Sequence, residues 1–138
     1  MSLDRLPVTM RNKPSSHRLN IIRRSIQEGK TLVDKKSFHK GMMKLKEEIE
    51  LDYRKFAGTG RCMKLSFQNG RKFIKVTKDN SVWGFIVKKN GYHKNERVVP
   101  GDVLKAASWR APAKWVRGNI YDTNLHWEWL KWTGPIYL

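Results

Sequence analysis

Residues 64 to 88 read KLSFQNGRKFIKVTKDNSVWGFIVK and carry the clearest β-strand pattern of the chain. Apolar and polar side chains alternate along most of it, which is typical of β-strands with one buried face. Asn69-Gly70 and the segment 78–80 interrupt this alternation with residues that favour turns. We therefore predict strands over 64–68, 71–77 and 81–88, with Gly84 at a bulge or a sharp bend.

The sequence after residue 88 continues in the same style, with short apolar runs between turn residues. Strands are predicted over 97–99 and 103–106, around the turn at 100–102, and over 119–122. Because five or so short strands with glycines at the corners would leave exposed edges in an open sheet, we expect a small antiparallel barrel of the SH3 or KOW type. A small open sheet packed on a long helix is the alternative.

The sequence before residue 60 has helical periodicity instead. A long helix is predicted from an N-cap at Ser37 to about Gly58, because apolar residues recur there at intervals of three and four. These residues are Phe38, Met42, Leu45, Ile49, Tyr53 and Phe56. A shorter basic helix is predicted from a cap at Ser15 or Ser16 to Gly29.

The predicted fold is therefore α+β, with N-terminal helices followed by a small antiparallel β-barrel. We expect a mobile basic arm over 1–14, a helical region over 15–58, and a barrel domain with a tryptophan-rich tail over 61–138.

Charge is the strongest pointer to function. The 138 residues include 29 Lys and Arg but 12 Asp and Glu, a formal net charge of +17. Such a surplus repels itself in a compact fold unless a polyanion neutralises it, so nucleic acid is the first partner to consider. The single cysteine, Cys62, excludes an intramolecular disulfide and fits a reducing cytoplasm. We expect no membrane partner, because no apolar run approaches the length of a span and the start lacks a signal peptide.

Two basic segments supply the candidate nucleic-acid contacts. The segment 108–117 combines two tryptophans with three cations in a loop that Pro112 stiffens, so stacking surfaces stand beside charges that suit phosphates. Its tryptophans could equally cover the barrel core. The candidate contacts are Arg11, Lys13, Arg18, Arg23 and Arg24 from the arm and first helix, and Trp109, Arg110, Lys114, Trp115 and Arg117 from the loop.

The tail carries three further indoles, Trp127, Trp129 and Trp132. Three indoles within six residues are too much apolar area to leave in water, so we expect them to pack in the core. The alternative is a protein interface, because tryptophan is a frequent interface anchor.

Signals for catalysis are weak, and we expect no enzyme, no cofactor and no metal site. The four histidines lack metal-ligand spacing, and the glycines fall at turns rather than in a phosphate-binding loop. A dyad of Cys62 with His93 or His126 is the least implausible catalytic arrangement.

Short pieces between residues 72 and 122, in one order, resemble a family of small, mostly uncharacterised proteins of tailed bacteriophages. They are the segments 73–76, 81–86, 101–109, 111–114 and 117–120. The resemblance implies a phage origin and the cytoplasm of a host cell, and brings no settled activity. The similarity to KOW barrels is looser, because it rests on a basic small barrel and the step at Gly101-Asp102-Val103.

Together these features predict a non-catalytic protein that binds DNA or RNA through phosphates with little sequence preference. The alternative is a phage-encoded inhibitor or modulator that docks on an acidic host protein, with the tryptophan tail as its anchor. The third possibility is a structural virion protein or a ribosome-associated protein, whose positive charge would hold it in the assembly.

Overall fold

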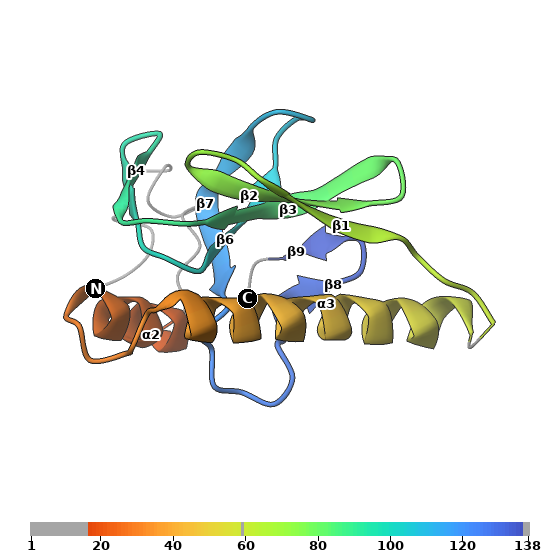
Figure 1. The fold of residues 1–138 in the computed structure, drawn as a ribbon, viewed down its shortest axis with the longest axis horizontal. Coiled ribbons are helices and arrows are strands. Elements are labelled where there is room, and N and C mark those ends of the chain that lie inside the picture. The colour runs from red at the N-terminus through yellow and green to blue at the C-terminus, as the bar shows by residue number, and fades with distance from the viewer. Residues whose placement is uncertain (1–16, 59, 137–138) are drawn as a thin grey trace, which may run out of the picture.

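The computed structural model describes residues 17–58 and 60–136, and within them two helices precede a largely antiparallel set of strands (Figure 1). The helices are α2 (His17–Gln27) and α3 (Lys35–Ala57). The main sheet has the order β1 (Leu65–Asn69), β2 (Phe73–Lys78), β3 (Ser81–Val87), β6 (Asp102–Ala106) and β7 (Pro112–Asn119). Two small hairpins pair β4 (Gly91–His93) with β5 (Glu96–Val98), and β8 (Leu130–Lys131) with β9 (Gly134–Pro135). The predicted α+β class is confirmed.

The sheet has two edge strands, β1 and β7. Among residues 17–58 and 60–136 the strand pairings run from β1 through β2, β3 and β6 to β7 and do not join the two edges. A closed barrel is therefore not confirmed. The arrangement corresponds to the alternative of a small sheet packed on a long helix, since α3 lies along one side of the sheet (Figure 1).

Local signals in the sequence fix the C-terminus of α2 and the N-terminus of α3. Helix α2 closes as predicted with a Schellman motif at Gly29 (φ 76°), because the N–H of Gly29 bonds to the carbonyl of Ile26 and that of Lys30 to Ser25. Helix α3 is capped by Asp34 and not by Ser37. The Asp34 carboxylate accepts the N–H of Ser37 at 2.7 Å, and the Ser37 hydroxyl accepts the N–H of Asp34 at 3.0 Å. Ser37 therefore forms the reciprocal half of a capping box.

The predicted arm over 1–14 and the caps Ser15 and Ser16 lie outside the described residues.

The apolar stripe of α3 packs on the strands through its middle. Met42, Leu45 and Ile49 are buried, and a Cβ on Gly41 would lie 2.9 Å from the Ile120 side chain, so the backbone approaches closely there. Phe56 departs from the prediction, because it is 72% exposed at the end of the helix.

The two predicted hairpins form, but the first turn is displaced by two residues. Asn69 pairs with Ile74 inside the ladder, so Arg71 and Lys72 form the turn. Gly70 serves a close approach rather than a positive φ, since a Cβ there would lie 2.7 Å from the Phe73 carbonyl oxygen.

The second hairpin matches its prediction. Lys78 pairs with Ser81 around Asp79-Asn80, and Asp79 has φ 50°. The bulge predicted near Gly84 is also present, because the register shifts between Val76 and Thr77.

The second half of the sheet differs more from the sequence prediction. The segment 112–117, expected as a loop, belongs to β7. Of the strand expected over 119–122, Asn119 ends β7 and the rest follows a turn in which the Asp122 N–H bonds to the Asn119 carbonyl. The β4–β5 hairpin was not predicted. Its turn residues Lys94 and Asn95 adopt positive φ without a glycine.

The two faces of the sheet bury separate apolar clusters. The larger cluster joins α3, the helix-facing side of the sheet and the tail, whereas the smaller one lies around Phe85, Val87, Val98 and Leu104. The β8–β9 hairpin of the tail lies between α3 and the sheet (Figure 1). The helical region and the strands therefore share one core.

Candidate nucleic-acid interface

The cations of α2 have three different environments. Arg18 donates to the Asp122 carboxylate at 2.8 Å while its side chain stays 47% exposed. Arg23 donates through Nε to both carboxylate oxygens of Asp102, at 3.0 and 3.1 Å, and its side chain is 23% exposed. Arg24 is exposed in the last turn of the helix.

Arg23 is one of several donors around a buried carboxylate. Asp102, at the start of β6, also accepts the Val99 N–H at 2.9 Å and the Asn119 side-chain amide at 2.9 Å. Burial raises the pKa of Asp102, although the charge of Arg23 and these donors oppose that shift. Arg23 thus fixes α2 to the sheet, and its guanidinium is occupied by Asp102 instead of being free for the phosphate contact that the sequence predicts.

Two of the three tail tryptophans pack in the core, as expected from the sequence. Trp127 is 3% exposed and Trp129 is 2% exposed, their rings stack at 4.8 Å, and both indole N–H groups donate to Asp122. Buried rings cannot anchor a partner, so the interface prediction is wrong for these two.

Trp132 is half-buried. Its ring stacks on Phe56 with centroids 5.0 Å apart and meets Tyr53 edge-on, while Lys78 Nζ lies 4.6 Å from its centroid. It closes the end of the core beside α3.

The predicted residues of β7 lie along an edge strand. Lys114 is exposed with Nζ 4.6 Å from the centroid of the half-buried Trp115. Arg117 is half-buried and donates to the Pro135 carbonyl at 3.2 Å, so it helps to hold β9 against the sheet. Lys114 is the residue of this group that remains most accessible to a polyanion.

The β6–β7 loop holds Trp109 outward. Two N–H groups, of Ala107 and Ser108, bond to the Ala111 carbonyl, and the Ser108 hydroxyl accepts the N–H groups of Arg110 and Ala111. Trp109, inside this bonded turn, is 51% exposed, and Lys75 Nζ lies 4.5 Å from its ring centroid. The loop thus presents an indole and a cation together.

A basic depression adjoins this loop, and we name it the hairpin depression. It measures about 270 Å³, and no acidic residue lines it in the described part of the chain. It is lined by Gln68, Asn69, Gly70, Arg71, Lys72, Phe73, Lys75, Phe85 and Arg110. Phe73 and Phe85 meet edge-on with centroids 6.1 Å apart. Cations and aromatic rings therefore line a single hollow beside Trp109.

The structure brings Trp109 and Arg110 together with residues that the sequence analysis did not select. Arg71, in the displaced turn, and Lys75, in the middle of β2, complete the basic group. One signal was present in the sequence: Phe73 and Lys75 alternate with Ile74 and Val76, so Lys75 belongs to the strand face away from the helix. The distance from residue 75 to residue 109 in the chain concealed the pairing.

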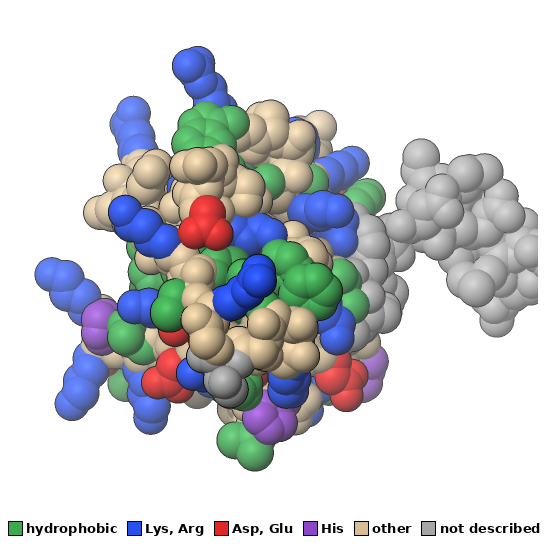
Figure 2. Space-filling model, turned by 90° about the vertical axis from the view of Figure 1, so that its right-hand side faces the viewer, with side chains coloured by type: hydrophobic (Ala, Val, Ile, Leu, Met, Phe, Trp, Pro, Cys, Tyr) green, Lys and Arg blue, Asp and Glu red, His purple; other side chains and the backbone are tan. Residues whose placement is uncertain are grey.

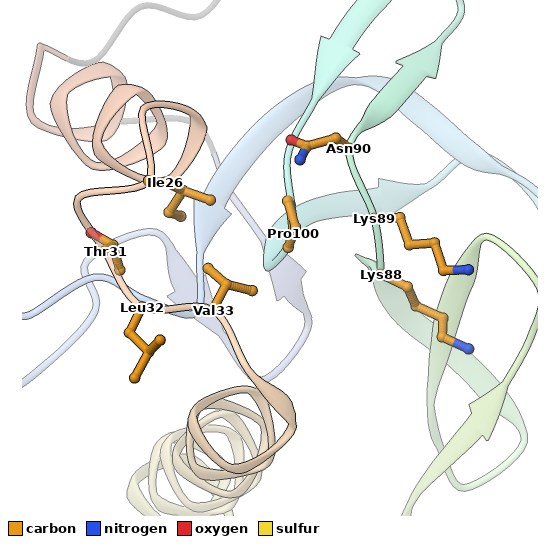
Figure 3. A pocket seen from close by; sticks show the side chains of 9 residues that line it. Ile26, Thr31, Leu32, Val33, Lys88, Lys89, Asn90 and Pro100 are labelled. Atoms are coloured by element: carbon orange, nitrogen blue, oxygen red, sulfur yellow. The ribbon is translucent and has the colours of Figure 1, made fainter.

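A second hollow, of about 440 Å³, differs in character (Figure 3). Ile26 and Val33 point across it toward Pro100, whereas the side chains of Lys88 and Lys89 extend away from it (Figure 3). Lys88 Nζ instead donates to the Gly70 carbonyl at 2.9 Å. One side of this hollow is apolar, and because Lys88 and Lys89 direct their ammonium groups away from it, the hollow does not present cations to a phosphate.

Basic side chains predominate at the surface as they do in the composition. Figure 2 shows one face of the molecule, on which Lys and Arg side chains project around the outline and outnumber the acidic ones. If every carboxylate paired with one cation, 17 cations would still have no acidic partner.

The two histidines that the sequence analysis considered as partners of Cys62 contact other groups. His93 lies 3.1 Å from the Pro112 carbonyl and His126 lies 3.5 Å from a Glu48 oxygen, while Cys62 is exposed. Within residues 17–58 and 60–136 no group of three His, Cys, Asp or Glu is placed to hold a metal ion. Neither α2 nor α3 is long and apolar enough to cross a membrane.

Comparison with known proteins gives a family without an assigned activity. Residues 15–138 match the family described as "Family of unknown function (DUF7717)", and the chain belongs to this family. No curated protein and no solved structure matches it.

Proposed function

We propose that this member of the family of unknown function is a non-catalytic nucleic-acid-binding protein. It binds DNA or RNA mainly through phosphates and with little sequence preference. The observation that carries the proposal is the cluster of Arg71, Lys75 and Arg110 around aromatic rings at the hairpin depression, on a protein with a net charge of +17. Arg24 and Lys114 supply further exposed cations. Arg11 and Lys13 stay candidates outside the described residues.

The chemistry of this cluster suits a polyanion. Guanidinium and ammonium groups neutralise phosphates and release counterions, which supplies most of non-specific affinity. Aromatic faces beside them tolerate any base, because every base has a π-face. We further propose that the protein is phage-encoded and acts in the host cytoplasm, as the resemblance of residues 72–122 implies.

The proposal is tested by removing three cations of the depression in the variant Arg71→Gln/Lys75→Gln/Arg110→Gln. We expect affinity for short DNA and RNA to fall, and the plot of log affinity against log salt to become shallower by about two to three units, since each lost phosphate contact removes close to one counterion. Fluorescence anisotropy over a salt series measures both effects.

The matched control removes three exposed cations elsewhere, in Lys35→Gln/Lys36→Gln/Lys40→Gln on α3. It lowers the net charge equally, so it should change affinity less than the depression variant does. Equal losses in the two variants would mean that overall charge alone, and not this surface, binds nucleic acid.

The alternative of an inhibitor that docks on an acidic host protein makes a different prediction. In a pull-down from host lysate it gives a defined protein complex that survives nuclease treatment. The proposed function predicts instead that nuclease releases the captured material. A flat response of nucleic-acid affinity to salt would also contradict the proposal.

A further inference from the structure

The hairpin depression and Trp109 also indicate which form of nucleic acid binds. We infer that this surface takes single-stranded nucleic acid, with one base stacked on Trp109 and the neighbouring phosphates held by Arg71, Lys75 and Arg110. The inference rests on the proposed function and adds the substrate class to it.

The first argument is the exposure of the indole. Trp109 leaves 51% of its surface in solvent, although the protein buries Trp127 and Trp129 almost completely. An exposed indole gains most by stacking on a flat ring, and the bases of a single strand are free to stack. In a duplex the base faces already stack on each other, so an indole would reach them only after unstacking. Trp109 therefore adds to the binding of single strands and not of duplexes.

The second argument is the arrangement of charge beside the ring. Lys75 Nζ lies 4.5 Å from the Trp109 ring centroid, and Arg110 is the next residue in the chain. In a nucleic-acid strand each base is attached to a sugar that has a phosphate on either side. A base stacked on the indole therefore brings these phosphates close to the two cations. The hollow of about 270 Å³ beside the ring is lined by these two cations and by the half-buried Phe73, so it offers further contacts to a base or sugar of the same strand.

The third argument is the loop itself. Four hydrogen bonds, through the Ala111 carbonyl and the Ser108 hydroxyl, fix residues 107–111 before any ligand binds. A loop backbone that is already held in place loses little conformational entropy on binding, which favours affinity. The surface is therefore preorganised for stacking.

Four fluorescent probes of about twelve nucleotides test this inference, within the usual size of single-strand sites. They are oligo(dT), oligo(U), a duplex, and an abasic strand with the same phosphates but no bases. We expect the full chain to bind one or both base-carrying strands about 5- to 150-fold more tightly than the abasic strand, the range that stacking of one base supplies. Trp109→Ala should abolish this preference, Trp109→Phe should keep part of it, and duplex affinity should stay unchanged.

The control is Phe56→Ala, which removes an aromatic ring that is 72% exposed at the end of α3. It should leave the preference for base-carrying strands intact. A preference shown by one of the two strands identifies that strand, DNA or RNA, as the ligand.

The outcomes separate the two proposals. If all four probes bind equally with a steep salt dependence, or if Trp109→Ala keeps the preference, the single-strand inference is overturned while the proposed function stands. If no probe binds, the proposed function fails as well.

Discussion

Helix α2 and the β6–β7 loop are both basic segments, yet the fold uses their cations in opposite ways. In α2, Arg18 and Arg23 face the carboxylates Asp122 and Asp102 of the strand region. In the loop, Arg110 has a hollow of basic and aromatic residues beside it. Whether a basic segment becomes structural or stays available to a ligand therefore depends on what the tertiary fold places opposite it. A carboxylate makes the cation part of the scaffold, and an open aromatic surface leaves it for a ligand.

The strongest way to test this contrast is Arg23→Gln. It leaves the Asp102 carboxylate buried without its charge partner, and breaking such a pair costs about 3–5 kcal/mol of stability. Urea denaturation at neutral pH measures the loss. Arg24→Gln, one residue further along the same helix but exposed, should change stability by no more than about 0.5 kcal/mol. Equal, small effects would show that Arg23 is not a structural clamp.

The pH dependence of that loss sharpens the test. Burial raises the pKa of Asp102, and removing Arg23 takes away the charge that opposes the shift. An acid with a raised folded pKa binds its proton more tightly in the folded state, so it destabilises the fold increasingly as pH rises above its unfolded pKa of about 4. The deficit of Arg23→Gln relative to the native chain should therefore shrink as pH falls toward 4. A deficit that grows on acidification would contradict this assignment.

Arg18→Gln should have a smaller effect than Arg23→Gln. Its partner Asp122 keeps the N–H of Asn124 and the indole of Trp129 as donors, and the Arg18 side chain is half in water. Because water reaches Arg18 while the Asp122 side chain is 7% exposed, we expect a loss of about 1–3 kcal/mol, between that of an exposed and that of a buried pair. Thermal denaturation followed by circular dichroism measures it. A loss as large as that of Arg23→Gln would place Arg18 in the same class of clamp.

Trp109→Ala should have the smallest effect on stability, within about 0.5 kcal/mol, because the side chain is half-exposed on the loop. Trp129→Ala is the comparison in the same assay. It removes a buried indole packed under Gly118, whose Cβ would lie 2.2 Å from the ring, and should cost about 3–5 kcal/mol. If both variants melt alike, the loop belongs to the core and the proposed interface loses its aromatic residue.

The local elements and the charge of this protein could be predicted from its amino-acid sequence. The period of α3, the Gly29 stop, the Asp79-Asn80 turn and the bulge beside Gly84 depend on residues within a few positions of each other. Helical and strand periods and turn chemistry are short-range, so they can be read along the chain. The net charge of +17 needs no structure at all.

Which basic and aromatic residues face solvent depends, by contrast, on the tertiary structure. Asp102 captures Arg23 from 79 positions away, and Trp129 fills the space under Gly118, while Trp109 with an equally apolar ring remains outside. The packing of β2 beside the β6–β7 loop also places Lys75 Nζ over the Trp109 ring, and the pairing of β7 with β6 makes residues 112–117 part of an edge strand. These outcomes depend on strand pairing and packing between distant segments. A side chain's burial and charge partner come from that packing, which local periodicity does not encode.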